Sequence, residues 1–161
     1  MPIAVGDKVP DVEVRTLGPD GMPQAVRTGE VLGAGKVVLF AVPGAYTPGC
    51  SKIHLPGFVK GADELLAKGV DKVACIAVND AWVMDAWGRE QGAGDKIQML
   101  ADGNAEFTKA MGLTFDGAVV GLGTRSQRYS AIIEDGVITS LDVEPQAGVD
   151  VSSCESTLAR L

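Results

Sequence analysis

The sequence is poor in the residues that bind metals or form disulfide frameworks. It has one histidine, His54, and three widely spaced cysteines, Cys50, Cys75 and Cys154. This set matches no usual zinc-ligand spacing, and without a Cys-x-x-Cys pair the chemistry of protein-disulfide oxidoreductases is not expected. An odd number of cysteines in a chain long enough to build its own core also argues against a disulfide framework. We therefore expect neither a bound metal nor a cofactor.

Positive charge and long apolar runs are also scarce. Lys and Arg total 14 against 21 Asp and Glu, a net charge of -7, and no basic cluster is present. Binding to nucleic acid depends on such clusters, because phosphates must be neutralised. The longest strongly apolar run, VVLFAV, is far too short to cross a bilayer. The start of the sequence resembles neither a secretory signal nor an Arg-rich transit sequence. These absences predict a cytoplasmic protein that binds neither nucleic acid nor membrane.

What the sequence has is enough apolar material for one core. Hydrophobic residues make up 46% of the 161 residues, while aromatic residues make up only 5%. This length is typical of one domain, and no change in composition indicates a linker. We expect a single domain spanning residues 1–161, with a mostly aliphatic core.

The order of hydrophobic patterns predicts an α/β fold. Alternation over residues 11–17 indicates a peripheral strand near the N-terminus, and Asp135-Gly136 between two alternating runs predicts a tight hairpin. Continuous apolar runs indicate strands buried on both faces at residues 36–42 and 71–78, and residues 96–102 indicate a third short strand. Helices are expected at residues 50–69, 79–90, 104–112 and 151–161. The resulting βαβ order predicts a mixed-sheet sandwich with an N-terminal β extension and helices on both faces, compatible with a thioredoxin-like fold.

Cys50 stands at a predicted helix start. In PGAYTPGC, Thr47 is suited to the N-cap and Pro48 to the first helical position, which places Cys50 in the first turn. Free N–H groups and the positive end of the helix dipole favour a thiolate there. The alternative is a small buried residue at a strand-to-helix turn. The rigid Pro- and Gly-rich loop favours the functional interpretation.

Residues 43–58, PGAYTPGCSKIHLPGF, resemble the active-site motif of peroxiredoxins, Pro-x-x-x-Thr-x-x-Cys, and most closely the type II and atypical two-cysteine subgroups. The resemblance continues through residues 68–88, 100–113, 121–136 and 141–145. It implies a thioredoxin-like fold and a thiol-dependent peroxidase that reduces hydrogen peroxide and organic hydroperoxides without metal, haem or flavin.

The resemblance also implies roles for individual residues. Cys50 would be the peroxidatic cysteine, which a hydroperoxide oxidises to a sulfenic acid. Thr47 would hydrogen-bond near the peroxide oxygens and orient the sulfur, and Pro43 would shield the pocket from water. The arginine of the family is matched to Arg125, whose guanidinium would stabilise the thiolate and the leaving oxygen. The backbone N–H groups of Gly49 and Cys50 would complete this site.

Two nearby basic residues receive other interpretations. Arg128 is expected to be a solvated charge at the start of the hairpin. His54 lies four residues after Cys50, but a protease-like dyad is not favoured, because Pro56 is expected to kink the helix just beyond it. His54 is expected to shape the substrate pocket or to make a structural hydrogen bond.

The second thiol of the cycle is left open. Cys75 is interpreted as core within a strand, whereas Cys154, at the start of the last helix, is predicted to be more accessible and is the candidate resolving residue. The alternative is an external thiol, either glutathione with glutaredoxin or thioredoxin. The resemblance further implies a homodimer with contacts near the active-site loops, to which Trp82 or Trp87 would contribute unless both are core residues.

Two other function classes remain as hypotheses. A redox-sensing module would use oxidation of Cys50 to change partner binding, and would consume about one equivalent of peroxide per chain. A purely structural thioredoxin-like domain would show sluggish alkylation of Cys50 near neutral pH. A peroxidase is distinguished from both by multiple turnover with an added thiol.

Overall fold

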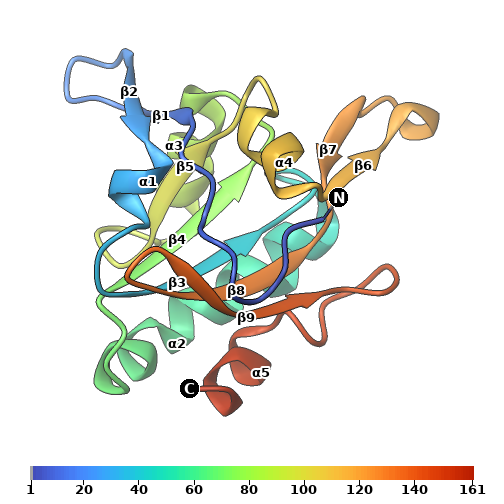
Figure 1. Ribbon diagram of the computed structural model, residues 1–161. Coiled ribbons are helices and arrows are strands. Elements are labelled where there is room, and N and C mark those ends of the chain that lie inside the picture. The colour runs from blue at the N-terminus through green and yellow to red at the C-terminus, as the bar shows by residue number, and fades with distance from the viewer. Residues whose placement is uncertain (1) are drawn as a thin grey trace.

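The computed structural model describes residues 2–161 and consists of a seven-stranded mixed sheet between two groups of helices (Figure 1). The strand order across the sheet is β2-β1-β5-β4-β3-β8-β9. The strands of the sheet are β1 (Glu13–Leu17), β2 (Pro23–Arg27), β3 (Lys36–Ala41), β4 (Lys72–Ala77), β5 (Gln98–Ala101), β8 (Tyr129–Glu134) and β9 (Val137–Val143). A separate hairpin pairs β6 (Thr114–Asp116) with β7 (Thr124–Ser126).

The centre of the sheet confirms the predicted parallel arrangement. Strands β3, β4 and β5 run parallel, while β8 joins the other side of β3 in antiparallel register, with Ala41 opposite Tyr129. Strands β1 and β2 form the predicted peripheral extension. They pair antiparallel to each other, and β1 also pairs antiparallel to β5. The carboxyl ends of the three parallel strands therefore lie at one edge of the sheet, where open α/β folds place ligand sites.

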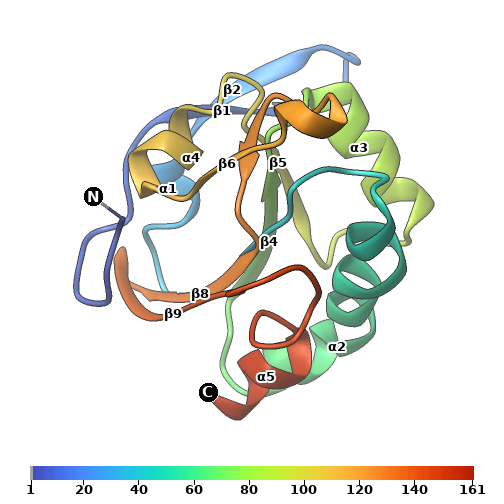
Figure 2. The same ribbon diagram turned by 90° about the vertical axis from the view of Figure 1, so that its right-hand side faces the viewer.

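Helices cover both faces of the sheet, as predicted (Figure 2). On one face lie α2, α3 and α5, and on the other α1 and α4. Their bounds are α1 (Thr28–Val31), α2 (Leu55–Ala67), α3 (Ala81–Glu90), α4 (Glu106–Met111) and α5 (Cys154–Ala159), with a short 3-10 turn, η2, at Ala118–Val120. Within residues 2–161 no helix is long and apolar enough to cross a membrane.

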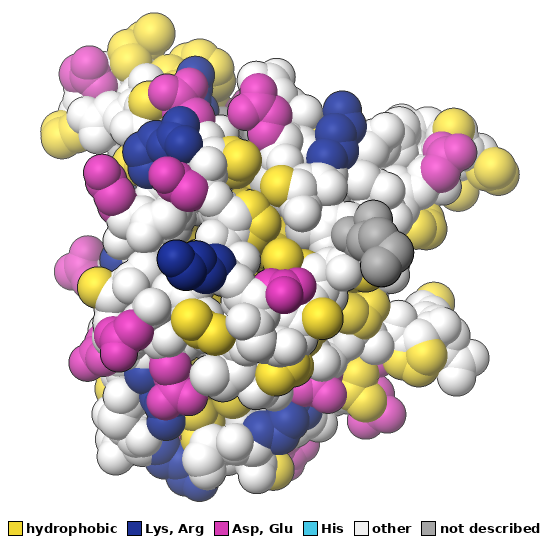
Figure 3. All heavy atoms as spheres, viewed as in Figure 1, with side chains coloured by type: hydrophobic (Ala, Val, Ile, Leu, Met, Phe, Trp, Pro, Cys, Tyr) yellow, Lys and Arg dark blue, Asp and Glu magenta, His cyan; other side chains and the backbone are white. Residues whose placement is uncertain are grey.

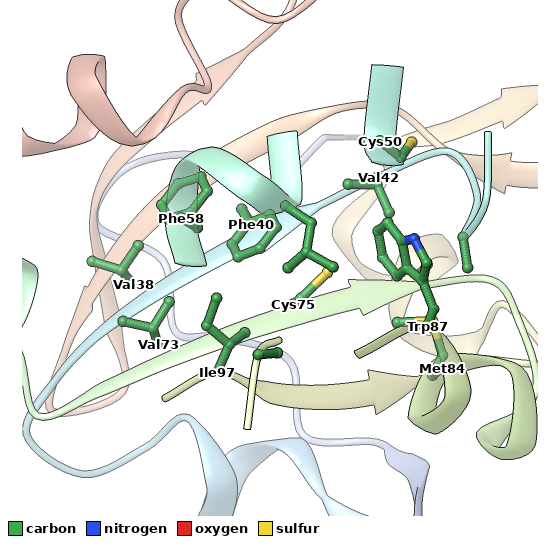
Figure 4. Close-up of a cluster of buried hydrophobic side chains, with 14 of the residues drawn as sticks. Val38, Phe40, Val42, Cys50, Phe58, Val73, Cys75, Met84, Trp87 and Ile97 are labelled. Atoms are coloured by element: carbon green, nitrogen blue, oxygen red, sulfur yellow. The ribbon is translucent and has the colours of Figure 1, made fainter. Parts of the chain in front are cut away.

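Strand β3 separates two apolar clusters, which explains its continuous hydrophobic run. Val38 and Phe40 point toward the cluster under α2 and α3, whereas Val37 and Leu39 belong to the cluster on the other face. In the first cluster Phe40 stacks on Phe58 of α2, with ring centroids 4.0 Å apart (Figure 4). Burial on both faces fixes this strand at the centre of the sheet.

Local signals at the ends of elements are confirmed. Asp80 caps α3 by accepting a hydrogen bond from the Val83 N–H at 2.9 Å, and Ser153 caps α5 by accepting from Ser156 N–H at 3.1 Å. The β8–β9 hairpin turns at Asp135 and Gly136, both with positive φ angles, +48° and +84°.

Two features were not predicted. The β6–β7 hairpin has no apolar alternation in its sequence, and its three-residue strands are too short to give a pattern. The helix that carries Cys50 contains a π-helical turn, η1 (Cys50–His54), in which the Leu55 N–H donates to the Cys50 carbonyl. Pro56 follows immediately and has no N–H to donate, so the irregularity expected at this proline is a widened turn on its N-terminal side.

Candidate functional site

The loop after β3 delivers Cys50 to the carboxyl edge of the sheet. The Ala45 N–H donates to Asn79 Oδ1 at 2.9 Å, which ties this loop to the one after β4. The helix then begins at Pro48, as predicted, and Cys50 lies in its first turn. The Cys50 side chain is fully buried and lies near Val42 and Trp87 (Figure 4).

The Thr47 hydroxyl is hydrogen-bonded to the Cys50 sulfur. Its Oγ1 lies 2.7 Å from the Gly44 carbonyl oxygen and 2.8 Å from Cys50 Sγ. The side chain makes these contacts in place of the side-chain cap predicted for it. A hydroxyl with one hydrogen can donate to the carbonyl while the sulfur is a thiol, and rotate to donate to the sulfur once it ionises.

Arg128 also contacts the sulfur, which overturns its interpretation as a solvated charge. Its Nη2 donates to Cys50 Sγ at 3.1 Å, and its Nη1 donates to His54 Nδ1 at 2.9 Å. Gly49 leaves room for this approach, because a Cβ there would lie 3.2 Å from Arg128 Nη2.

Arg125, the arginine predicted to contact the sulfur, has a different position. Its Nε donates to the Leu122 carbonyl at 3.0 Å and its Nη1 to the Pro43 carbonyl at 3.2 Å. The guanidinium thus holds the loop that carries Pro43, and the assignment of the sulfur-binding arginine is corrected from Arg125 to Arg128.

The register between β3 and β8 explains why Arg128, and not Arg125, reaches the Cys50 sulfur. Arg125 belongs to β7 of the separate hairpin, whereas Arg128 immediately precedes β8. Since Ala41 at the end of β3 lies opposite Tyr129, residue 128 is carried next to the start of the Cys50 loop. Spacing in the sequence does not reveal this register.

His54 is a buried, neutral imidazole between Arg128 and the last loop. An arginine only donates, so Nδ1 must accept from Arg128, and the proton is therefore on Nε2, which donates to the Ser152 carbonyl at 2.8 Å. Burial is the main cause that lowers the pKa of His54 to about 4. The predicted structural hydrogen bond is confirmed, and neither ring nitrogen is left to take the thiol proton.

A cavity of about 530 Å³ lies beside these groups. Its lining includes Pro43, Arg128, Phe115 of β6 and Pro145 from the loop after β9. Pro43 is partly exposed there, whereas the sulfur is not exposed at all. The cavity therefore provides an approach to Arg128 past a largely apolar wall.

The other two cysteines are buried and unpaired. Cys75 is in β4 opposite Phe40, and burial raises the pKa of its thiol, as expected for a core residue. Cys154, the first residue of α5, turns its sulfur against Gly61 of α2, and burial raises the pKa of this thiol to about 11. The prediction that Cys154 is accessible is wrong, because α5 packs on α2 with this side chain facing inward.

The two tryptophans differ in burial. Trp87 is fully buried and its Nε1 donates to Ser51 Oγ at 3.0 Å, so it is a core residue next to Cys50. It cannot contribute to a contact between subunits in this conformation. Trp82 is 51% exposed, and its Nε1 donates to the Gly21 carbonyl at 2.9 Å.

Sequence reasoning missed Glu144 and Ser152. Glu144 Oε2 accepts hydrogen bonds from Asp150 N at 2.7 Å, Ser152 N at 2.9 Å and Ser152 Oγ at 2.6 Å. Partial burial acts to raise the pKa of Glu144, but these hydrogen bonds outweigh it and lower the pKa overall. Glu144 lies in one of the blocks that resemble peroxiredoxins, LDVEP, but no chemical pattern singled it out.

The arrangement can hold a reactive sulfur but shows no metal centre. Within residues 2–161, no group of three or more His, Cys, Asp or Glu side chains is placed to hold a metal ion. Two hydrogen-bond donors, Thr47 and the guanidinium of Arg128, meet instead at one buried sulfur. Such donors stabilise negative charge, whether on the sulfur or on an oxygen next to it.

Comparison with known proteins places the chain in a family. The Redoxin family model matches residues 4–158. Peroxiredoxin-2E-2, chloroplastic, of Oryza sativa subsp. japonica is 48% identical over 163 residues, which cover 99% of this chain and 72% of that protein. Peroxiredoxin-2B of Arabidopsis thaliana is 41% identical, with 99% of both chains covered.

Solved structures show the same relationship. The reduced Prx3 of Vibrio vulnificus in complex with H2O2 has a TM-score of 0.92 and 50% identity, covering 99% of both chains. The oxidised form of Prx3 from the same organism has a TM-score of 0.90 and 51% identity, again over 99% of both chains. The fold is thus the thioredoxin-like fold of these proteins. With the Redoxin match and the type II relatives, this shows that the chain belongs to the peroxiredoxin family, and that it is a thiol-dependent peroxidase.

Proposed function

We propose that Cys50 is the peroxidatic residue and that it cycles through a sulfenic acid. The observation that carries this assignment is the meeting of the Thr47 hydroxyl and the Arg128 guanidinium at its buried sulfur, 2.8 Å and 3.1 Å away. The substrate is hydrogen peroxide or a small organic hydroperoxide that enters by the cavity next to Pro43.

In the first step the thiolate attacks one oxygen of the hydroperoxide. A sulfur–oxygen bond forms, the oxygen–oxygen bond breaks, and the leaving oxygen takes a proton to become water or an alcohol. The sulfur is oxidised by two electrons and the peroxide is reduced by two. Arg128 and the first-turn N–H groups of Gly49 and Cys50 stabilise the charge on the leaving oxygen, and Thr47 orients the sulfur. Pro43 keeps water from the site.

In the second step an external thiol reduces the sulfenic acid. One equivalent of glutathione, glutaredoxin or thioredoxin thiol forms a mixed disulfide with Cys50 and releases water. A second thiol then attacks the sulfur of the first reductant, forms a disulfide with it and releases the Cys50 thiolate. Both internal candidates are buried, and Cys154 lies against Gly61, 11 residues beyond Cys50. At 1.5 Å per helical residue this is a separation of about 16 Å along the helix, well beyond the reach of a disulfide. An internal disulfide with Cys154 would require α5 to leave α2.

The experiment is a peroxide-consumption assay with each reductant, followed by mass spectrometry of the oxidised protein. We expect multiple turnover with glutathione and glutaredoxin or with thioredoxin, its loss in Cys50→Ser, and its retention in Cys154→Ser. A glutathione adduct on Cys50 would agree with the external route. Full activity of Cys50→Ser would disprove the assignment of Cys50, and a Cys50–Cys154 crosslink would disprove the external route.

We also propose that two copies of the chain associate through the β6–β7 hairpin. Phe115, Val119 and Val120 of this hairpin are exposed, the last two by 99% and 70%. The hairpin projects from the body of the molecule, with hydrophobic side chains at its tip (Figures 1 and 3). Phe115 also lines the cavity beside Arg128, so a second copy on this hairpin would lie near the active site.

A further inference from the structure

A continuous chain of hydrogen bonds connects the Cys50 sulfur to the carboxylate of Glu144. Arg128 donates to the sulfur and to His54 Nδ1, and His54 Nε2 donates to the carbonyl of Ser152. The N–H and the hydroxyl of the same serine donate to Glu144 Oε2. The peroxidase mechanism described above uses the first member of this chain, Arg128, and leaves the others without a role.

The carboxylate of Glu144 holds Ser152, the last residue before it in this series of hydrogen bonds, in place. One oxygen, Oε2, accepts three hydrogen bonds, from Asp150 N and from the N and Oγ of Ser152. These bonds fold the loop after β9 back on the end of its own strand. Glu144 is itself anchored beside the active site, because its N–H donates to the Arg128 carbonyl at 2.9 Å. The loop after β9 is thus attached to the backbone of Arg128, the residue whose side chain binds the Cys50 sulfur.

The position of the Ser152 carbonyl determines whether His54 Nδ1 presents a lone pair or a proton to Arg128. While that carbonyl accepts from Nε2, the proton stays on Nε2 and Nδ1 presents a lone pair to the guanidinium. Without this acceptor the ring could carry its proton on Nδ1, which would face the guanidinium donor to donor. The buried ring packs against both Phe40 and Phe58 and has no other hydrogen-bond partner among the described residues.

From these contacts we propose that Glu144 is a positioning residue of the peroxidatic site. Acting through Ser152 and His54, it holds the Arg128 guanidinium against the Cys50 sulfur. The C-terminal segment 144–153 is therefore part of the assembly that keeps the sulfur reactive. This inference rests on the proposed roles of Cys50 and Arg128, and adds to them a residue whose carboxylate acts on the site through Ser152 and His54.

The test is the rate of Cys50 alkylation by iodoacetamide as a function of pH, read by mass spectrometry on the peptide that contains Cys50. This measurement needs no peroxide and no reductant. Glu144→Ala is compared with Glu155→Ala, which removes an exposed carboxylate from the first turn of α5. Glu144→Gln removes the charge while keeping the side-chain shape, in case the alanine variant folds poorly. We expect Glu144→Ala to slow alkylation near neutral pH about threefold to tenfold, and Glu155→Ala to change it by less than about twofold.

A double-mutant cycle separates action through His54 from general loosening. In His54→Leu the acceptor for Arg128 is gone, so adding Glu144→Ala should slow alkylation no further. His54→Asn retains an oxygen near the position of Nδ1, and we expect it to alkylate faster than His54→Leu. Additive effects of the two substitutions, or an unchanged rate in both Glu144→Ala and Glu144→Gln, would overturn the positioning role alone. An unchanged rate in Arg128→Met would overturn it together with the proposed role of Arg128.

Discussion

At the scale of single residues, the reactivity of the site depends on which guanidinium reaches the sulfur. Arg128 donates to Cys50 Sγ, whereas Arg125 donates to the Pro43 carbonyl. Both are arginines in one short segment, and the residue types alone fit either role. The difference between them is one of position in the sheet, and it predicts different consequences when each is replaced.

We expect Arg128→Lys to reduce the second-order rate constant with hydrogen peroxide about 10²-fold to 10³-fold, as for loss of a donor that stabilises a developing oxyanion. A lysine supplies one point charge in place of a fork that binds sulfur and imidazole together. Arg125→Lys should have a smaller effect, since it acts on the loop and not on the reacting atoms. Stopped-flow measurement of both variants tests this order, and the reverse order would restore Arg125 as the sulfur-binding residue.

Gly49 gives a prediction in which activity and stability change in opposite directions. Its backbone is helical, with φ -65° and ψ -36°, so alanine is accommodated and favours the helix by up to about 1 kcal/mol. The added Cβ would lie 3.2 Å from Arg128 Nη2 and push the guanidinium away from the sulfur. We expect Gly49→Ala to lower the rate with peroxide about tenfold without lowering the unfolding midpoint. A fall in both quantities would mean that the substitution acts by disturbing the fold.

The sequence predicted which types of residue form the site better than it predicted which residues hydrogen-bond to one another. Thr47 and Cys50 could be identified because they lie within one helical turn, where spacing translates directly into proximity. Arg128, Ser152 and Glu144 reach the site through pairing of β3 with β8 and through the fold of the last loop. These contacts join residues 74 and 98 positions apart, as in Arg128–His54 and His54–Ser152. Local patterns do not encode separations of this size.

At the scale of elements, the docking of α5 on α2 depends on one small residue facing one sulfur. A Cβ at Gly61 would collide with Cys154 Sγ. We expect Gly61→Ala to destabilise the protein by about 1–3 kcal/mol, the usual cost of overpacking, and Cys154→Ala in the same chain to recover much of this loss. Denaturant unfolding of the two single variants and the double variant checks the coupling. If the two effects simply add, the helices do not rely on this contact.

The widened turn at the start of α2 carries His54, whose titration gives a pH prediction. The imidazole faces the charges of Arg128 and Glu144 and lies one turn after the Cys50 thiol. Because the folded protein lowers the pKa of His54 from 6.5 to about 4, the unfolded chain binds a proton more readily between these values. His54 therefore does not lower the free energy of unfolding above pH 6.5. As the pH decreases from 6.5 to 4, the free energy of unfolding decreases by up to about 3 kcal/mol because of this residue.

Denaturant unfolding of the wild type and of His54→Asn, measured from pH 7 to pH 4, isolates this contribution. The lowered pKa of Glu144 acts in the same direction and is present in both proteins. We expect a shallower loss of stability on acidification in His54→Asn. Parallel curves would show that His54 is not protonated on unfolding in this range.

Elements with strong patterns were predictable, and those shaped by tertiary packing were not. The apolar run of β3 fits only a strand that is buried on both faces, and Asp135-Gly136 fits a tight turn because such a turn requires positive φ angles. The π-helical turn at Cys50–His54 has no such signature, and neither has the inward direction of Cys154. Both follow from how α2 packs against its neighbours, which is settled only when the whole chain is folded.

At the scale of the whole molecule, the projecting β6–β7 hairpin predicts self-association. Val119 and Val120 expose apolar side chains at its tip, while the chain carries a net charge of -7. Apolar burial favours association of two copies and like charge opposes it, so added salt should strengthen the dimer. Sedimentation velocity across protein concentration and salt tests this. We expect Val119→Asp with Val120→Asp to give a monomer, and a dimer that persists in this variant would place the interface elsewhere.

His54 is the single histidine of the sequence, and it lies one hydrogen bond from the arginine that binds the sulfur. Its ring protons are therefore the only histidine resonances in a proton NMR spectrum, and a His54→Asn variant identifies them by their loss. Oxidation of the nearby sulfur, attachment of glutathione or movement of the last helix would each shift them differently. The state of the proposed peroxidatic site can thus be followed in solution during turnover, in the unlabelled protein.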